Sequence, residues 1–314
     1  MKILVAGATG AMGKQLLPRL AAEGHDVTGI TRSEGKLDTI RSLGARGVVA
    51  DVLDPDDVAR VVAEAEPDVI IHQLTALNRP FDVRHFDRTF EETNRLRTEA
   101  TDHLLAAGRA TGVKRFIAQS FAGWPFARTG GLVKTEEDPL DPSPPNGMRQ
   151  SFDAIRHVET AVTGADWTEG IVLRYGGFYG PGTSLSHEGG EQVELIRARK
   201  FPLVGDGSGV WSFVHIEDAA EATVAAVTRG RRGIYNIVDD EPAPVAEWLP
   251  AAASAIGAPP PRHVPRWLGR IVAGEAAVAM MTDVRGASNE KAKRELGWQP
   301  RHPSWRKGFE QVAA

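Results

Sequence analysis

Short apolar runs alternate with longer amphipathic segments along the first half of the chain. Apolar runs bounded by turn residues are typical of strands, and apolar residues at helical spacing are typical of helices packed on one face. The alternation therefore predicts repeated strand–helix–strand units and a parallel sheet that is covered on both faces. The predicted strands are 3–6, 26–30, 47–50, 69–72, 115–119 and 170–174, and the predicted helices are 14–22, 36–43, 55–65, 90–111 and 152–163.

Beyond residue 180 the apolar stretches become shorter and isolated glycines separate them, which indicates a second and smaller lobe. Helices are expected at 193–199 and 218–228, and a strand at 233–238 that returns to the main sheet. We therefore predict an α/β fold: a Rossmann-type doubly wound parallel sheet with a smaller C-terminal substrate lobe. The expected Rossmann domain is 1–177, with 212–238 returning to it, and the substrate lobe comprises 178–211 and 239–314. Residues 125–147, rich in proline, glycine and acidic residues, are predicted to form a loop after a strand, where ligands bind in such sheets.

Composition narrows the classes of function. The chain has 314 residues and a formal net charge of -4 with no dense basic block, which argues against a nucleic-acid partner. It has no cysteine, which excludes disulfide and thiolate chemistry. No apolar run reaches the roughly 18 residues of a membrane span, and we see no charged and apolar leader, so a cytoplasmic location is expected. No His, Asp or Glu group has the close helical spacing of a metal site, so no metal is predicted.

The first strand is followed by the segment Gly7-Ala-Thr-Gly10-Ala-Met-Gly13 and then by a predicted helix. A dinucleotide diphosphate needs backbone N–H groups at a helix N-terminus, a tight turn and no β-carbon where the phosphate approaches. The spacing and its place in a strand–loop–helix unit predict a nicotinamide dinucleotide site. The alternative is a glycine-rich turn in a fold that has lost its ligand.

The end of the second predicted strand favours NADP(H) over NAD(H). A carboxylate there would accept from the ribose hydroxyls, whereas a cation suits a 2′-phosphate. The chain has Arg32, Ser33 and Lys36 at this point, two cations and a hydroxyl donor. Asp51, after the third strand, would suit the adenine amino group, although an Asp that opens a loop is as often a cap.

Several further segments make the chain similar to an extended short-chain dehydrogenase/reductase of the epimerase/dehydratase branch. The resemblance covers nearly the whole chain and is carried by the glycine loop, 68–72, Asn94, 113–120, 173–182, 213–218 and 289–300. It implies that Ser120 is the catalytic serine and Asn94 its support. It also implies that the cofactor follows the carboxyl ends of the strands, contacting Gly7, Thr9, Gly10, Ala11, Met12, Gly13, Arg32, Ser33, Lys36, Asp51, Val52, Leu74, Thr75, Gln119, Tyr175, Gly177 and Phe178.

The chain departs from this family at the proton donor. In the family a tyrosine is followed four residues later by a lysine, which lowers the tyrosine pKa and holds the ribose. Only three tyrosines occur, and none has a lysine at that spacing. Counting back from Glu159 places Ser151 at the tyrosine position and Ile155 at the lysine position. An alkanol is too weak an acid to replace the phenol.

Three other side chains are possible replacements for the missing proton donor. Tyr175 stands beside the expected nicotinamide and is a candidate catalytic residue, with packing as the alternative. Tyr179 is interpreted as a packing residue. His187 lies in a glycine-rich stretch where an imidazole could move a proton, but an exposed loop histidine is the simpler interpretation. His72 and His215 are interpreted as structural.

These features favour an NADP(H)-dependent oxidoreductase that acts on a small carbonyl or alcohol substrate with a non-standard proton donor. The first alternative is an inactive NADP(H)-binding sensor or regulator. The second is a nucleotide-sugar epimerase or dehydratase, which is disfavoured because it needs the missing tyrosine. The resemblance also implies a possible homodimer built on helices 90–111 and 152–163.

Overall fold

The computed structural model describes residues 1–77, 82–186 and 189–313, and its centre is a parallel sheet of seven strands in the order β12-β7-β5-β4-β1-β2-β3. Every neighbouring pair in this sheet is parallel, and the order reverses at β1, as in a doubly wound sheet. The predicted α/β Rossmann-type fold is therefore confirmed. The strands are β1 (Lys2–Ala6), β2 (Asp26–Thr31), β3 (Arg46–Val49), β4 (Val69–His72), β5 (Arg115–Phe121), β7 (Glu169–Tyr175) and β12 (Gly233–Ile237).

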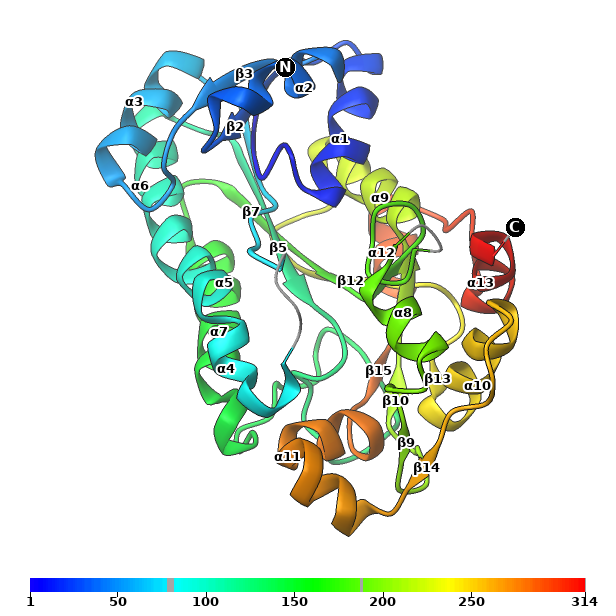
Figure 1. Cartoon of the computed structure of the whole chain (residues 1–314). Helices are drawn as coiled ribbons and strands as arrows, with labels where there is room; N and C mark the ends of the chain where they lie inside the picture. The colour runs from blue at the N-terminus through cyan, green and yellow to red at the C-terminus, as the bar shows by residue number, and fades with distance from the viewer. Residues whose placement is uncertain (78–81, 187–188, 314) are drawn as a thin grey trace.

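Helices cover both faces of the sheet (Figure 1). One face carries α3 (Pro55–Ala65), α6 (Thr101–Thr111) and α7 (Arg149–Gly164), and the other carries α1 (Ala11–Ala22), α9 (Ile216–Thr228) and α12 (Glu290–Leu296). Alternate residues of β1 belong to different cores: Ile3 packs on the side of α1, and Leu4 on the side of α3. Burial on both faces is why these strands read as continuous apolar runs in the sequence.

The segment 90–111, predicted as one helix, consists of three pieces. It contains α5 (Glu91–Arg95), a π-helical turn η3 (Leu96–Ala100) and α6. The expectation of an uninterrupted helix was therefore wrong, although the helical extent was nearly right. Single π-turns inside α-helices are frequently found at functional sites, because they redirect the side chains on either side.

A second core lies around Phe213, Trp248 and Trp305, mostly formed by the part of the chain after residue 178. Its helices are α8 (Glu191–Arg197), α10 (Val245–Ala255), α11 (Arg266–Thr282) and α13 (Trp305–Ala313), of which the sequence analysis anticipated only α8. α11 is kinked at Gly274, whose φ is 87°. None of the helices that the structure describes is long and apolar enough to cross a membrane.

The remaining elements are short. They are η1 (Glu34–Lys36), α2 (Leu37–Ser42), η2 (Val83–His85), α4 (Phe86–Thr89), β6 (Val133–Lys134), η4 (Asn146–Met148), β8 (Gly177–Tyr179), β9 (Leu203–Val204), β10 (Val210–Trp211), β11 (Phe213–His215), β13 (Ala243–Pro244), β14 (His263–Val264) and β15 (Gly286–Ala287). The predicted loop 125–147 is largely irregular, but β6 inside it pairs with β15 from near the end of the chain.

Candidate cofactor and active site

The glycine loop between β1 and α1 is shaped for close backbone contact. Gly7 has a φ of 97°, and a β-carbon on it would lie 2.6 Å from the carbonyl oxygen of Gln73 at the end of β4. A β-carbon on Gly13 would lie 2.4 Å from the carbonyl oxygens of both Gly7 and Ala8. A side chain at Gly7 would push the loop away from β4, and one at Gly13 would push α1 away from the loop, so the fold requires glycine at both positions.

The N-terminus of α1 has the properties of an anion site. Gly10 is the residue before the helix and offers no side-chain cap, and no acidic residue lies in the first turn. The first N–H groups of the helix are therefore available to a ligand and carry its positive dipole end. Of the predicted contacts here, the side chain of Met12 is buried in the core, whereas Thr9 and Ala11 are half-buried. This arrangement fits the diphosphate of a dinucleotide.

The positive residues after β2 lie at the surface. Arg32 is 61% exposed, and its Nη1 donates to Oε1 of Glu92 on α5 at 2.8 Å. Ser33 and Lys36 are exposed as well. A phosphate at this edge of the sheet would meet two cations, one of which already has a carboxylate partner.

Some of the residues predicted to contact the adenine already form hydrogen bonds within the protein. Oδ1 of Asp51 accepts from the backbone N–H of Leu53 at 3.0 Å, so this carboxylate caps its own turn. Val52 is buried and Thr75 is exposed. The carbonyl of Leu74 accepts from Nε2 of Gln119 at 3.1 Å, and this bond ties the exit of β4 to β5.

The hydroxyl of Tyr175 is turned into the core. Tyr175 is 2% exposed, its oxygen accepts from Nε2 of Gln73 at 3.0 Å, and it lies 2.7 Å from Oγ1 of Thr223. Thr223 donates its own proton to the carbonyl of Ala219, so Tyr175 must donate to Thr223. Burial raises the pKa of Tyr175 well above its usual value. These contacts satisfy the phenol internally, and we do not assign it a role in proton transfer. Gly177 and Phe178 follow it in half-buried positions.

Ser120 contacts an ion pair. Its Oγ donates to Oε1 of Glu159 at 2.7 Å, and Glu159 accepts two further bonds from Arg174 at 2.7 and 2.6 Å. All three residues are buried. The hydroxyl predicted to orient a substrate carbonyl is thus committed to a buried carboxylate that joins β5, β7 and α7.

Asn94 and Ser151 contact each other at the start of α7. The hydroxyl of Ser151 donates to Oδ1 of Asp87 at 2.8 Å and accepts from Nδ2 of Asn94 at 3.2 Å. Because Ser151 has given its single proton to Asp87, the amide orientation of Asn94 is fixed. Oδ1 of Asn94 is buried and has no hydrogen-bond partner among the described residues.

Ile155 belongs to an aromatic cluster that the sequence analysis did not detect as a unit. The rings of Phe86 and Phe90 stack at 4.6 Å, and Trp124 meets Phe86 edge-on at 5.2 Å and Phe121 in a stack at 5.5 Å. Side chains from α11 complete the cluster, which contains Phe86, Phe90, Trp124, Met148, Phe152, Ile155, Ala276 and Val284. Only the apolar stripe on α7 could be seen in the sequence, because the other members come from separate segments.

A second feature that sequence reasoning missed is Arg97, in the π-turn. It is 5% exposed, and Nε and Nη1 have no hydrogen-bond partner within the part of the chain that the structure describes. Its guanidinium carbon lies 5.8 Å from the centre of the Phe90 ring. Burial lowers the pKa of Arg97 to about 10, and the nearby Glu159 carboxylate opposes that shift. A helix pattern alone gives no signal for this residue.

His72 and His215, interpreted as structural from the sequence, contact other side chains and the backbone. His72 is buried, and its Nε2 lies 3.1 Å from the Leu96 carbonyl oxygen and 3.1 Å from the Thr101 hydroxyl oxygen. Burial lowers the pKa of His72 to about 4. Tyr179 packs edge-on against the ring of His215 at 5.2 Å. His187 lies outside the described residues.

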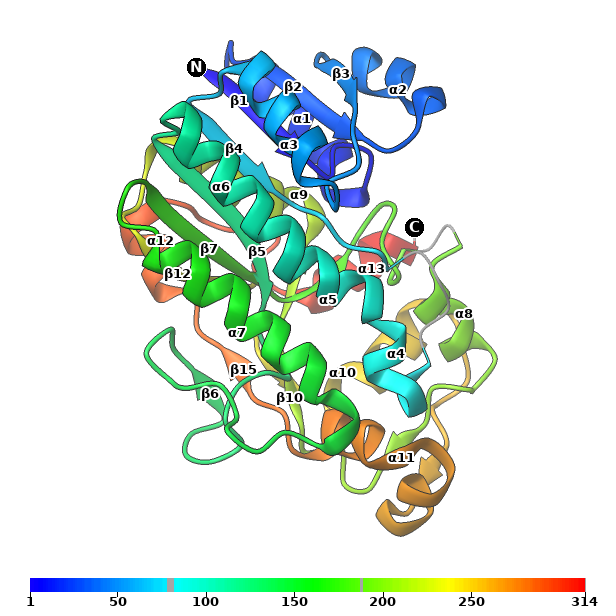
Figure 2. The ribbon, with the colours of Figure 1, turned by 90° about the vertical axis from the view of Figure 1, so that its left-hand side faces the viewer.

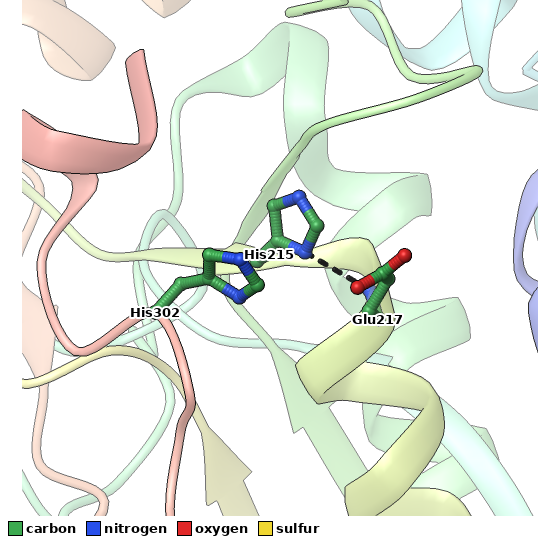
Figure 3. Close-up of side chains that lie close together, drawn as sticks. All are labelled: His215, Glu217 and His302. Atoms are coloured by element: carbon green, nitrogen blue, oxygen red, sulfur yellow. Dashed lines mark hydrogen bonds between the residues drawn. The ribbon is translucent and has the colours of Figure 1, made fainter. Parts of the chain in front are cut away.

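His215, Glu217 and His302 form a group whose possible ligand atoms lie within 4.8 Å of one another (Figure 3). Nδ1 of His215 accepts from the backbone N–H of Glu217 at 3.3 Å and thereby caps α9. Nδ1 of His302 lies 3.1 Å from Oδ2 of Asp218. These bonds explain the group as a capping arrangement, and we assign no ion to it. The sequence could not show the group, because His302 is distant along the chain.

Comparison with known proteins places this geometry in a family. The model of the NAD dependent epimerase/dehydratase family matches residues 3–238. A 3-diazoavenalumate denitrifying reductase of a Streptomyces species is 44% identical over 311 residues, covering 98% of this chain and 99% of the relative. UDP-glucose 4-epimerase of Mycolicibacterium smegmatis is 27% identical over 319 residues, covering 96% of this chain and 94% of the relative.

Solved structures share the fold over the whole chain. UDP-glucose 4-epimerase of Thermotoga maritima, solved with UDP-glucose, has a TM-score of 0.77 at 21% identity and covers 100% of this chain and 97% of that chain. A human epimerase family protein, SDR39U1, solved with NADPH, has a TM-score of 0.74 at 22% identity, with 100% and 99% covered. The family resemblance predicted from the sequence is confirmed.

Proposed function

The chain belongs to the NAD-dependent epimerase/dehydratase family, and from that membership we propose that it is an NADPH-dependent reductase that removes a diazo group from an aromatic carboxylic acid as dinitrogen. The observation that carries the proposal is that the candidate hydroxyl donors among the described residues of the site are bonded within the protein. Ser151 and Ile155 replace the tyrosine and lysine of the family, and the hydroxyls of Ser151 and Ser120 are bonded to carboxylates.

The chemistry of a diazo group explains why this site can work without such a donor. Reduction of a carbonyl leaves an oxygen that must receive a proton, whereas an arenediazonium ion needs only a hydride. In the overall reaction, Ar–N₂⁺ and a hydride give Ar–H and N₂: a carbon–hydrogen bond forms, the carbon–nitrogen bond breaks, and dinitrogen leaves with the bonding electron pair. A bound nicotinamide would supply that hydride.

Two further observations support this substrate class. The relative with 44% identity bears a name that describes a reductase removing nitrogen from a diazo-substituted carboxylate. The aromatic cluster that contains Trp124 and Ile155 has a half-buried edge at Phe121, which stacks on Trp124. Such surfaces suit an aromatic ring and exclude water.

The residues that would hold the cofactor follow from the fit described above. The loop from Gly7 to Gly13 and the free N–H groups of α1 would bind the diphosphate. Arg32 and Lys36 would bind the 2′-phosphate that distinguishes NADPH from NADH. The role of the protein is then to align the hydride donor with the carbon that bears nitrogen, which by itself can supply a large part of the rate.

The test uses the purified full chain with NADPH and an aromatic carboxylic acid that bears a diazo group. We expect loss of NADPH absorbance, stoichiometric release of dinitrogen, and transfer of deuterium from NADPH labelled at C4 into the product ring. Reactions without protein measure the uncatalysed reduction.

Other outcomes would replace the proposal with a different function. Tight NADPH binding without turnover on diazo or carbonyl compounds would indicate a sensor or regulator. Interconversion of nucleotide sugars would indicate an epimerase. Reduction of carbonyl compounds in preference to diazo compounds would indicate a carbonyl reductase.

A further inference from the structure

The space beside Ile155 contains a buried cation that comes from another helix. α5 and α7 pack side by side (Figure 2), and Asn94 of α5 bonds to Ser151 at the start of α7. Arg97, one turn after Asn94, interacts electrostatically with Glu159, two turns after Ser151. Ile155 lies midway between Ser151 and Glu159 on α7. Arg97 is therefore placed opposite the position at which the family carries its lysine.

The direction of the Arg97 side chain agrees with this placement. Its guanidinium lies 5.8 Å from the ring of Phe90, seven residues earlier in the chain and thus closer to the carboxyl ends of the strands. Long side chains on helices lean toward the N-terminus of the helix, as this one does. Phe90 and Ile155 belong to the same aromatic cluster. The guanidinium accordingly reaches toward the site from the sheet side.

Several buried polar atoms near Arg97 have no hydrogen-bond partner among the described residues. Nε and Nη1 of Arg97 and Oδ1 of Asn94 are buried, and none has a hydrogen-bond partner among the described residues. A buried guanidinium without such partners is costly, so a ligand oxygen that accepts from it would stabilise the folded protein. The unpaired groups include both donors and an acceptor. A hydroxyl oxygen can accept from Arg97 and its proton can go to Asn94, whereas a carboxylate could satisfy only the arginine.

We propose that Arg97 binds the ribose hydroxyls on the nicotinamide half of the cofactor and supplies the cation that residue 155 lacks. The inference rests on the cofactor of the proposed function and is independent of the proposed substrate. The π-turn η3 contains Arg97 and sets where its side chain leaves the helix. Ile155 allows the aromatic cluster to continue along α7. Arg97, on the opposite helix, then supplies the positive hydrogen-bond donor for the ribose.

The test compares two ligands on the full chain by calorimetric titration. One is the reduced dinucleotide that the wild type binds more tightly, and the other is its adenosine fragment, 2′,5′-ADP for NADPH or ADP for NADH. Arg97→Met should weaken the dinucleotide by about tenfold or more, because charged hydrogen bonds are lost. The fragment, which has no nicotinamide ribose, should bind unchanged.

A second variant tests whether a cation at position 155 on α7 can replace the one that Arg97 supplies from η3. Arg97→Met combined with Ile155→Lys should regain most of the lost dinucleotide affinity, because an ammonium then approaches the ribose from α7. Arg95→Met is the matched control: Arg95 lies on the same helix but is exposed and paired with Glu99, so neither ligand should be affected.

Two results would overturn the inference. Unchanged dinucleotide affinity in Arg97→Met would show that Arg97 does not contact the cofactor, and an equal loss for dinucleotide and fragment would show that it only supports the fold. If Arg97→Met does not fold, Arg97→Gln, which keeps a polar side chain but removes the charge, takes its place, and an unchanged dinucleotide affinity there would overturn the inference too. Absence of diazo reduction with these binding results intact would reject the substrate proposal alone.

Discussion

Arg32 is the residue on which the proposed preference for NADPH rests. It is exposed at the end of β2 and forms an ion pair with Glu92. Arg32→Glu should raise the dissociation constant for NADPH by about tenfold to a hundredfold, because charge-assisted bonds to the 2′-phosphate are replaced by repulsion. NADH, which lacks that phosphate, should bind nearly as before. Fluorescence titration of both reduced cofactors provides the measurement.

Arg41→Glu is a suitable control for Arg32→Glu. Arg41 lies on α2, is exposed, and pairs with Asp38, so the variant changes the net charge equally without touching the end of β2. An equal weakening of NADPH and NADH by Arg32→Glu would contradict the 2′-phosphate assignment. Weakening of NADPH alone by Arg41→Glu would show that long-range charge is responsible.

The buried pair of Glu159 and Arg174 dominates the stability around Ser120. Glu159→Gln would leave the Arg174 guanidinium without its carboxylate and should lower the free energy of unfolding by about 3–5 kcal/mol. Ser120→Ala removes one charge-assisted hydrogen bond and should cost about 2 kcal/mol. Urea denaturation measures both changes. Ser120→Ala should keep its turnover at a temperature where it is folded, and a loss of turnover there would show that Ser120 acts on the substrate.

At the scale of elements, the glycine loop and β4 form one unit. Gly7→Ala places a β-carbon against the carbonyl of Gln73 in a backbone with positive φ, so the loop must move away from β4. We expect a loss of about 2–4 kcal/mol in the free energy of unfolding, since strain and steric overlap add. Cofactor binding should fall by more than tenfold, because the N–H groups of α1 shift as well.

Gly24→Ala separates the effect of backbone strain at a positive φ from the effect of steric overlap with β4. Gly24 also has a positive φ, 77°, but a β-carbon there meets nothing within 4 Å. This control should lose only about 1 kcal/mol and keep cofactor affinity. If both variants behaved alike in unfolding and in titration, the contact with β4 would have no importance of its own.

The sequence predicted elements well where their own residues determine them. The seven strands of the sheet and α3, with Asp54 as its cap, follow from local apolar patterns and capping chemistry. The π-turn at Leu96–Ala100 did not follow, because it changes the side-chain direction without changing the helical character of the sequence. α10 and α11 were missed because their alanine-rich, apolar segments lack a clear polar face.

For the whole molecule, the sequence could identify positions but not partners. It predicts Ser151 and Ile155 at the positions of the family's tyrosine and lysine, and it names Ser120 and Asn94 as candidates. It could not show that Ser120 donates to Glu159, that Tyr175 is bonded within the core, or that the Arg97 guanidinium lies near the ring of Phe90. Those contacts join segments far apart in the chain, and only tertiary packing brings them together.

A buried carboxyl at the junction between the main sheet and the second core should make the stability of the whole molecule depend on pH. Asp239 follows β12, is buried, and its Oδ2 has no hydrogen-bond partner among the described residues. Burial raises the pKa of Asp239 to about 8, so the folded protein keeps this carboxyl protonated where the unfolded chain has released its proton. The contribution of Asp239 to stability is complete at acidic pH below its unfolded value and is lost as pH rises toward 8.

Asp239→Asn removes this titration. Relative to the variant, the wild type should lose on the order of 1 kcal/mol of unfolding free energy per pH unit between pH 6 and pH 8. Above pH 8 the difference should level off. Urea midpoints at pH 6, 7, 8 and 9 measure the trend. Asp153→Asn is the control, since Asp153 is an exposed carboxylate on α7 in an ion pair with Arg156 at 2.9 Å and is not among the groups that act on Asp239. A constant difference between wild type and Asp239→Asn would mean that Asp239 is ionised in the folded protein, with a cation or water near Oδ2 compensating its charge.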